Sequence, residues 1–236
     1  MNIYFLGGGN MAAAIAGGLV RQGGHRVHIA NRGKEKRERL AEELGVSVSE
    51  KLPELAANDV LVLAVKPQDM QPACQGVQTN GALVLSVAAG LSIATLSRYL
   101  GGTRRIVRVM PNTPGKIGLG VSGMFADDSV SDQDKAAADS IMRAVGITVW
   151  LDGEERLHDI TGISGSGPAY VYKRQAGCAE TGGPTAGFRR RRGAQAEFGN
   201  LQRSRCAGRA DGRGFCRIAA KRYLQRRHHP RGHRNL

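Results

Sequence analysis

IYFLGGGNMA, residues 3–12, joins an apolar run to a glycine-rich turn, and this stretch decides the expected fold. Its first four residues are typical of a buried strand. The segment Gly7–Ala12 then fits the pattern G-x-G-x-x-A at the start of a helix predicted over Ala12–Arg21. In this pattern the first glycine makes a tight turn, the second lets a pyrophosphate approach the backbone, and the small last residue lets helix and strand pack closely. Free N–H groups and the positive dipole end of the helix face the phosphates. The stretch therefore predicts dinucleotide binding, with a purely structural turn as the alternative.

The end of the second predicted strand, Val27–Ala30, indicates which dinucleotide is bound. An NAD enzyme carries an acidic side chain there, which accepts a hydrogen bond from the ribose 2′-hydroxyl. This chain has Asn31-Arg32 instead, followed by Lys34 and Lys36. A guanidinium can hold a 2′-phosphate through two hydrogen bonds. NADP(H) is therefore favoured and NAD(H) remains possible, while a solvated basic loop is the alternative interpretation.

Short β-branched runs alternate with helical patterns through the first 151 residues, which is typical of a parallel sheet wound with helices. Strands are predicted at Ile3–Leu6, Val27–Ala30, Val60–Val65, Ala82–Ala88, Ile106–Met110 and Ile147–Leu151. Helices are predicted at Ala12–Arg21, at Lys34–Leu44 with a stop at Gly45, at Ser92–Leu100, from a capping box at Ser131 and Asp134 to Gly146, and from Glu154 past Tyr170. The fold class is thus α/β, with a doubly wound Rossmann-type sheet in residues 1–151 and the start of a helical domain in residues 152–171.

Charge divides the chain at about residue 171. The whole chain carries 34 Lys and Arg against 20 Asp and Glu, a net charge of +14. Residues 172–236 hold 17 basic and 3 acidic residues, so that the first 171 residues are neutral. Cys74 is the single cysteine before the boundary, which indicates a reducing compartment. The apolar start has no basic leader and is broken by Gly7–Asn10, and no run reaches the ~20 apolar residues of a membrane span. A cytoplasmic protein without a membrane segment is expected.

Five further segments occur in a particular order. They are Phe5–Met11 (FLGGGNM), Ala64–Pro67 (AVKP), Ser86–Gly90 (SVAAG), Met110–Pro114 (MPNTP) and Ser164–Tyr170 (SGSGPAY). Together they resemble the pyrroline-5-carboxylate reductase family, from residue 1 to about residue 171. The resemblance implies NAD(P)H-dependent reduction of the C=N bond of 1-pyrroline-5-carboxylate to L-proline. It also implies a helical dimerisation domain after the sheet, and therefore a homo-oligomer built from dimers.

The resemblance assigns cofactor-binding residues. Gly7, Gly9, Asn10 and Met11 would hold the pyrophosphate, and Asn31 and Arg32 would meet the 2′-phosphate. The cofactor cleft would be lined by Ala64, Val65, Lys66, Pro67, Val87, Ala88 and Ala89, and Met110–Pro114 would border the nicotinamide. No side-chain acid is obvious in this part. The candidate catalytic residues are Asn112 and Thr113, which could equally form a proline-bounded turn. A protonated iminium is already electrophilic, so orientation beside the nicotinamide could supply most of the catalysis.

Residues 172–236 have no sustained helical or strand period and are rich in Gly and Arg, so a disordered basic tail is predicted. They also lack the Lys-Gly-Gly-Thr-Thr type of motif with which the family ends. Codons chosen for residues 221–235 and read from each second base permit NVTSKGGTTHEAIET. The same shift permits TFKGAVALAEQ over 200–210 and LDALKRAALRQGFDA over 176–190. We therefore interpret the tail as the family sequence read out of frame from a point between Val171 and Ala176. On this interpretation the substrate and dimer domain is scrambled, and the chain as written is impaired.

Two other functions remain open. One is a related NADP-dependent imine or keto reductase that shares the first domain. The other is a nucleic-acid binder whose phosphate contacts lie in the tail at Arg189–Arg192 and Arg226–Arg234. Few aromatic residues and no repeated RGG spacing make nucleic acid an unfavoured partner. The tail's cysteines with His228, His229 and His233 fit no standard zinc spacing, so no metal is expected.

Overall fold

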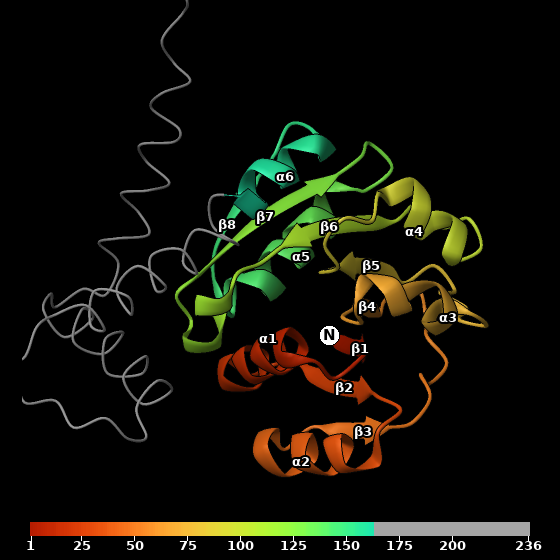
Figure 1. Ribbon diagram of the computed structural model, residues 1–236, viewed down its shortest axis with the longest axis vertical. Coiled ribbons are helices and arrows are strands. Elements are labelled where there is room, and N and C mark those ends of the chain that lie inside the picture. The colour runs from red at the N-terminus through yellow and green to blue at the C-terminus, as the bar shows by residue number, and fades with distance from the viewer. Residues whose placement is uncertain (163–236) are drawn as a thin grey trace, which may run out of the picture. The chain divides into compact units, whose positions relative to one another are not determined.

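The computed structural model describes residues 1–162. An eight-stranded sheet with the order β3-β2-β1-β4-β5-β6-β7-β8 forms its centre (Figure 1). The strands are β1 (Asn2–Leu6), β2 (Arg26–Ala30), β3 (Ser47–Ser49), β4 (Val60–Leu63), β5 (Leu83–Ser86), β6 (Ile106–Met110), β7 (Gly120–Ala126) and β8 (Gly146–Trp150). Neighbouring strands run parallel except β6 and β7, which are antiparallel. The predicted α/β class and the mostly parallel sheet are confirmed. The predictions for the tail, and for a helix continuing past Tyr170, lie outside the described residues.

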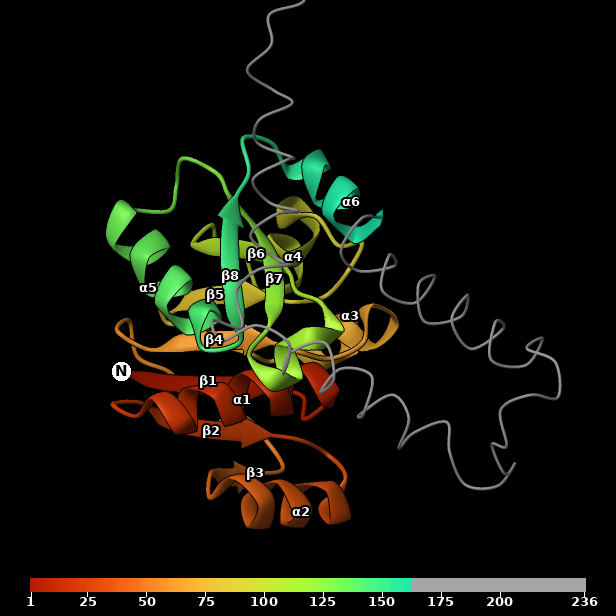
Figure 2. The ribbon, with the colours of Figure 1, turned by 90° about the vertical axis from the view of Figure 1, so that its left-hand side faces the viewer.

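Helices cover both faces of the sheet (Figure 2). One face carries α1 (Asn10–Gln22), α2 (Lys34–Leu44) and α5 (Asp132–Arg143), and the other carries α3 (Met70–Cys74) and α4 (Ile93–Tyr99). The remaining helical elements are the 3-10 turns η1 (Pro67–Asp69), η2 (Thr113–Ile117) and η3 (Glu154–Arg156), and the short helix α6 (Leu157–Ile160). No helix within residues 1–162 is long and apolar enough to cross a bilayer.

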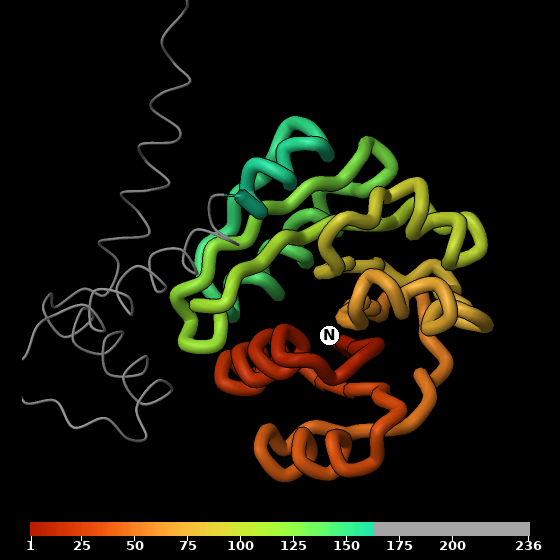
Figure 3. Tube along the Cα trace, viewed as in Figure 1, coloured from red at the N-terminus to blue at the C-terminus, as the bar shows by residue number. Residues whose placement is uncertain are grey.

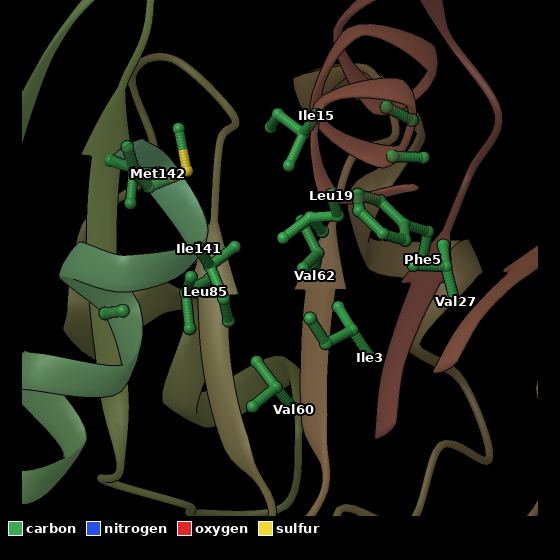
Figure 4. Packing of buried hydrophobic residues seen from close by; sticks show 14 of the residues in the cluster. Ile3, Phe5, Ile15, Leu19, Val27, Val60, Val62, Leu85, Ile141 and Met142 are labelled. Carbon is green, nitrogen blue, oxygen red and sulfur yellow. The ribbon is translucent and has the colours of Figure 1, made fainter. Parts of the chain in front are cut away.

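The central strand β4 shows why its sequence lacks polar alternation. Val60 and Val62 pack into the cluster beneath α1 and α5, whereas Leu61 and Leu63 pack into the cluster beneath α3 and α4. Figure 4 shows the first of these clusters, with Val60 and Val62 between the side chains of α1 and those of α5. Because both faces are covered, every residue of this strand must be apolar.

Predicted and observed helices and strands differ at their ends, and three observed ones have no predicted counterpart. The second helix matches the prediction, and Gly45 ends it in the left-handed conformation with φ of 65°. Helix α1 begins at Asn10 rather than at Ala12, and β4 and β5 end at Leu63 and Ser86, earlier than predicted. The elements β3, α3 and β7 were not predicted. A three-residue strand and a five-residue helix are too short to show a period, and β7 contains two glycines that weaken a strand pattern.

The chain order places a crevice at the carboxyl ends of β1 and β4. The trace in Figure 3 leaves β1 for α1, moves outward to β3, and then returns past β1 to form β4. Helix α1 lies on one face of the sheet and the helix after β4, α3, lies on the other. Connections that leave two neighbouring strands toward opposite faces open the place where such sheets bind ligands.

Candidate dinucleotide-binding site

Gly7 makes the turn that leads from β1 into the crevice. Its N–H donates to the carbonyl of Ala30 at 2.8 Å, and its φ of 98° lies in the left-handed region that favours glycine. A Cβ at this position would lie 2.7 Å from Val65 Cγ1 and 2.9 Å from the carbonyl oxygen of Ala64. The first glycine of the motif is therefore required by both conformation and space.

Gly9 faces open space at the start of α1. A Cβ there would meet only the carbonyl oxygen of Ala64, at an ordinary contact distance of 3.7 Å. Gly9 is also the N-cap of this 13-residue helix, and no side chain caps the helix or places an acid in its first turn. By contrast, Ser92 and Ser131 cap α4 and α5 through their hydroxyls. An uncapped helix N-terminus beside an open glycine fits an anionic group such as a pyrophosphate.

Asn31, at the end of β2, connects two loops. Its Oδ1 accepts a hydrogen bond from the N–H of Gly8 at 3.2 Å, and its Nδ2 donates to the carbonyl of Gly33 at 3.2 Å. Both ends of the Asn31 amide thus make hydrogen bonds to the backbone around the site. Arg32 and Lys34 are exposed; the ammonium of Lys34 lies 3.8 Å from Glu38, and the guanidinium of Arg32 is the cationic group that we consider for an anion at this corner. Gly33, the N-cap of α2, makes no side-chain capping bond either.

The segment after β4 lies beside the glycine turn, and the segment after β5 lies beside the end of β4. The N–H of Ala64 donates to the carbonyl of Leu6 at 2.9 Å, and the N–H of Val87 donates to the carbonyl of Leu63 at 3.1 Å. Ala64, Val65 and Val87 are half-buried, whereas Lys66 and Ala89 are exposed. The structure thus places Ala64 and Val65 next to the predicted pyrophosphate turn, and Val87 one strand further along the sheet.

The two candidate catalytic residues differ in their surroundings. Asn112 is buried, and its Oδ1 accepts a hydrogen bond from the N–H of Val121 at 2.9 Å, which ties the turn after β6 to β7. Thr113 is exposed at the start of η2. These contacts give Asn112 a structural task of the kind expected for a proline-bounded turn.

Glu154 joins elements beside the predicted cleft segments and was not found from the sequence. Its Oε1 accepts from the N–H of Ile93 at 2.7 Å and from Nη1 of the buried Arg108 at 2.9 Å. One carboxylate thereby joins the beginning of α4, which follows the Ser86–Gly90 segment, to β6 and to η3. Glu154 and Ile93 are 61 residues apart in the chain, and no local pattern connects them.

A groove of about 320 Å³ runs from the glycine turn along α1 and α2. Its cationic lining residues are Arg21, Arg39 and Lys116, and it reaches Gly9 and Asn10 at one end. Lys116, in η2, is a second residue near the turn that the sequence did not single out. A larger hollow of about 540 Å³ lies around Thr79–Gly81 and Gly101–Thr103, away from this turn, and has no Lys, Arg, Asp or Glu in its lining.

Comparison with known proteins shows the family of the chain. A family model described as NADP oxidoreductase coenzyme F420-dependent matches residues 2–90. A pyrroline-5-carboxylate reductase of Pseudomonas aeruginosa is 42% identical over 176 residues. The solved structure of a pyrroline-5-carboxylate reductase from Coxiella burnetii is 32% identical, with a TM-score of 0.70 and coverage of 94% of this chain and 84% of that one. The chain belongs to the pyrroline-5-carboxylate reductase family.

Membership in the pyrroline-5-carboxylate reductase family confirms the resemblance seen in the five sequence segments. The match to the Pseudomonas protein covers 72% of this chain and 64% of that protein, so the chain spans just under two thirds of that relative's length. The fold is also shared with a Plasmodium falciparum pyrroline carboxylate reductase solved with NADP bound, which is 24% identical with a TM-score of 0.64. That match covers 89% of this chain and 80% of the Plasmodium chain.

Proposed function

We propose that the chain is an NADP(H)-dependent reductase that converts 1-pyrroline-5-carboxylate to L-proline. The observation that carries this proposal is the uncapped N-terminus of α1 beside the open face of Gly9, in a chain of this family. The Plasmodium protein with NADP bound supports NADP as the cofactor that this fold accepts. The absence of a carboxylate directly after β2, where Asn31 and Arg32 stand, supports a 2′-phosphate over a free 2′-hydroxyl.

Each part of the cofactor has residues proposed to hold it. Gly7 and Gly9, with Asn10 and Met11 in the first turn of α1, would bind the pyrophosphate through backbone N–H groups. Arg32 would pair with the 2′-phosphate, while Asn31 acts mainly by fixing the two loops. The walls would be formed by Ala64–Pro67 and Val87–Ala89.

The reduced nicotinamide supplies a hydride when it is bound, and the residues of this chain determine where the imine carbon lies relative to it. Met110–Pro114 would border the ring. Because the Asn112 amide holds the turn against β7, the exposed hydroxyl of Thr113 is the better candidate for a substrate contact. A protonated C=N bond needs no further activation by an acid, so positioning is the main task that we assign to this loop.

We further propose the oligomeric state of the enzyme, its cellular compartment and whether the chain as written is active. In line with the family, the active enzyme would be a homo-oligomer built from dimers. The single free cysteine of the described residues, Cys74, is buried and agrees with a reducing cytoplasm. The out-of-frame interpretation of residues 172–236 further leads us to propose that the chain as written binds cofactor but lacks a working substrate and dimer domain.

Two measurements on two chains test these proposals. The chain as written, and a version with the reading frame restored after Val171, are titrated with NADPH by fluorescence and then assayed for NADPH oxidation that depends on pyrroline-5-carboxylate. We expect both chains to bind NADPH and only the restored chain to form proline. Absence of NADPH binding in both chains would overturn the proposed function. Equal turnover by the two chains would overturn the proposed impairment alone.

A further inference from the structure

Arg37, in α2, faces inward although it belongs to the most highly charged helix of the described sheet domain. Its side chain is 17% exposed, compared with 79% for Lys34 and 61% for Arg39 on the same helix. Nη1 of Arg37 donates to the carbonyl of Asn31 at 2.8 Å and to the carbonyl of Arg32 at 2.8 Å. Nη2 lies 3.9 Å from the carboxylate of Glu50. One guanidinium therefore holds two consecutive carbonyls of the loop after β2.

The hydrogen bonds from Arg37 to these two carbonyls also set the direction of the N–H groups in the same peptide units. None of the described peptide bonds is cis, and in a trans peptide the C=O and N–H point to opposite sides. The carbonyls of Asn31 and Arg32 point toward Arg37, so the N–H groups of Arg32 and Gly33 point away from it. Those N–H groups share the loop with the exposed side chain of Arg32.

Other contacts of the loop do not involve the Arg37 side chain. The N–H of Asn31 donates to the carbonyl of Ser49 at 2.9 Å, and the side chain of Asn31 binds Gly8 and Gly33. The backbone N–H of Arg37 also donates to the carbonyl of Gly33 at 3.2 Å, but the carbonyls of Asn31 and Arg32 are held by the Arg37 side chain. A binding loop that is ordered before its ligand arrives gains affinity, because the ordering does not have to accompany binding.

We propose that Arg37 is a positioning residue that sets the preference for NADPH over NADH. The inference rests on the proposed function and adds a residue that acts through the loop rather than on the cofactor. Nη1 of Arg37 already donates to the two carbonyls. The Arg37 side chain therefore acts by orienting Arg32 and its backbone toward the 2′-phosphate. The pyrophosphate turn at Gly7–Gly9 belongs to a different loop, so a cofactor that lacks the 2′-phosphate should depend little on Arg37.

The test compares Arg37→Met with Arg98→Met, which removes an exposed arginine from α4, outside the groove. Dissociation constants for NADPH and NADH are measured by fluorescence on the full chain, together with the thermal midpoint of each variant. We expect Arg37→Met to weaken NADPH binding about tenfold and NADH binding less than about twofold, since one ordered charged contact is lost. Arg98→Met should leave both constants unchanged.

Arg37→Lys is the second variant, for use if Arg37→Met does not fold. A lysine keeps the charge but replaces the planar fork by a single ammonium, so a smaller loss that again falls on NADPH is expected. Equal weakening of NADPH and NADH, or no weakening of either, would overturn the inference while leaving cofactor binding intact. A wild-type chain that binds neither dinucleotide would overturn the proposed function together with this inference.

Discussion

The Oδ1 of Asn31 accepts a hydrogen bond from the backbone N–H of Gly8 at 3.2 Å, and this contact joins the glycine turn after β1 to the loop after β2. The two loops are proposed to hold two anionic groups of one ligand, the pyrophosphate and the 2′-phosphate. A side chain that the sequence predicts to be a ligand contact thus also sets the distance between two binding elements.

Asn31→Asp should change the preference between the two cofactors. An aspartate can still accept from Gly8, but it cannot donate to Gly33, and its charge repels a 2′-phosphate while accepting from a 2′-hydroxyl. We expect the dissociation constant for NADPH to rise at least about tenfold and that for NADH to stay level or fall. Fluorescence titration measures both constants. Asn58→Asp, an exposed site before β4, is the control for the added charge, and a parallel loss in both variants would contradict the assignment.

The first and second glycines of the motif should respond differently to alanine. Gly7→Ala places a Cβ 2.7 Å from Val65 Cγ1 at a φ of 98°, so a loss of about 2 kcal/mol or more in the free energy of unfolding is expected. Gly9→Ala meets only an ordinary contact at 3.7 Å, so stability should change little. Its methyl group would instead lie where the pyrophosphate is proposed to approach, and NADPH and NADH affinity should fall together. Urea unfolding and cofactor titration of both variants separate the two effects, and normal cofactor affinity in Gly9→Ala would contradict the placement.

Arg105 and Asp134 form a two-point ion pair that should make stability depend on acid. Nε lies 2.8 Å from Oδ2 and Nη2 lies 2.6 Å from Oδ1. Hydrogen bonding from Arg105 holds the pKa of Asp134 below its ordinary value of 3.8. Because the pKa is lower in the folded chain, the stabilisation is complete above that value and is lost as the pH falls through the folded value.

Asp134→Asn tests this pair. The variant should lose about 1–2 kcal/mol of unfolding free energy at neutral pH, discounted because the Arg105 side chain is 35% exposed. The gap from wild type should close in strong acid. Urea unfolding at neutral pH and below pH ~3 measures both limits. The exposed Asp128→Asn serves as the control, and a gap that persists unchanged in acid would rule out the ion pair as its cause.

Gly123 should be required for the contact between β7 and α6. A Cβ at this position would lie 2.8 Å from Cγ1 of Ile160 and 3.0 Å from Cγ2. Gly123→Ala is therefore expected to cost about 1–3 kcal/mol of unfolding free energy. Ile160→Ala in the same chain should relieve part of that cost, so a double-mutant cycle should show coupling between the two sites. Additive losses would mean that the contact does not limit the position of α6.

The sequence predicted the glycine turn and the basic end of β2 because both depend on neighbours within about ten residues. It could not predict that Asn31 binds Gly8, nor that Glu154 binds Ile93 and Arg108, because those partners meet only after the sheet has formed. The inward direction of Arg37 was hidden for the same reason. In a helix with many charged residues, the sequence does not show which basic side chain will donate hydrogen bonds to two backbone carbonyls.

Local sequence patterns therefore determined the α/β class and the bounds of α2 with its end at Gly45. They also determined the apolar strand β4, which helices cover on both faces. These follow from backbone conformation and from the periods of strand and helix, which are written into adjacent residues. Tertiary structure decided the antiparallel strand β7, whose glycines weaken a strand pattern but at Gly123 make room for Ile160. It also decided which polar groups became supports of the site, since a hydrogen bond between distant segments exists only once the packing of the core has brought its donor and acceptor together.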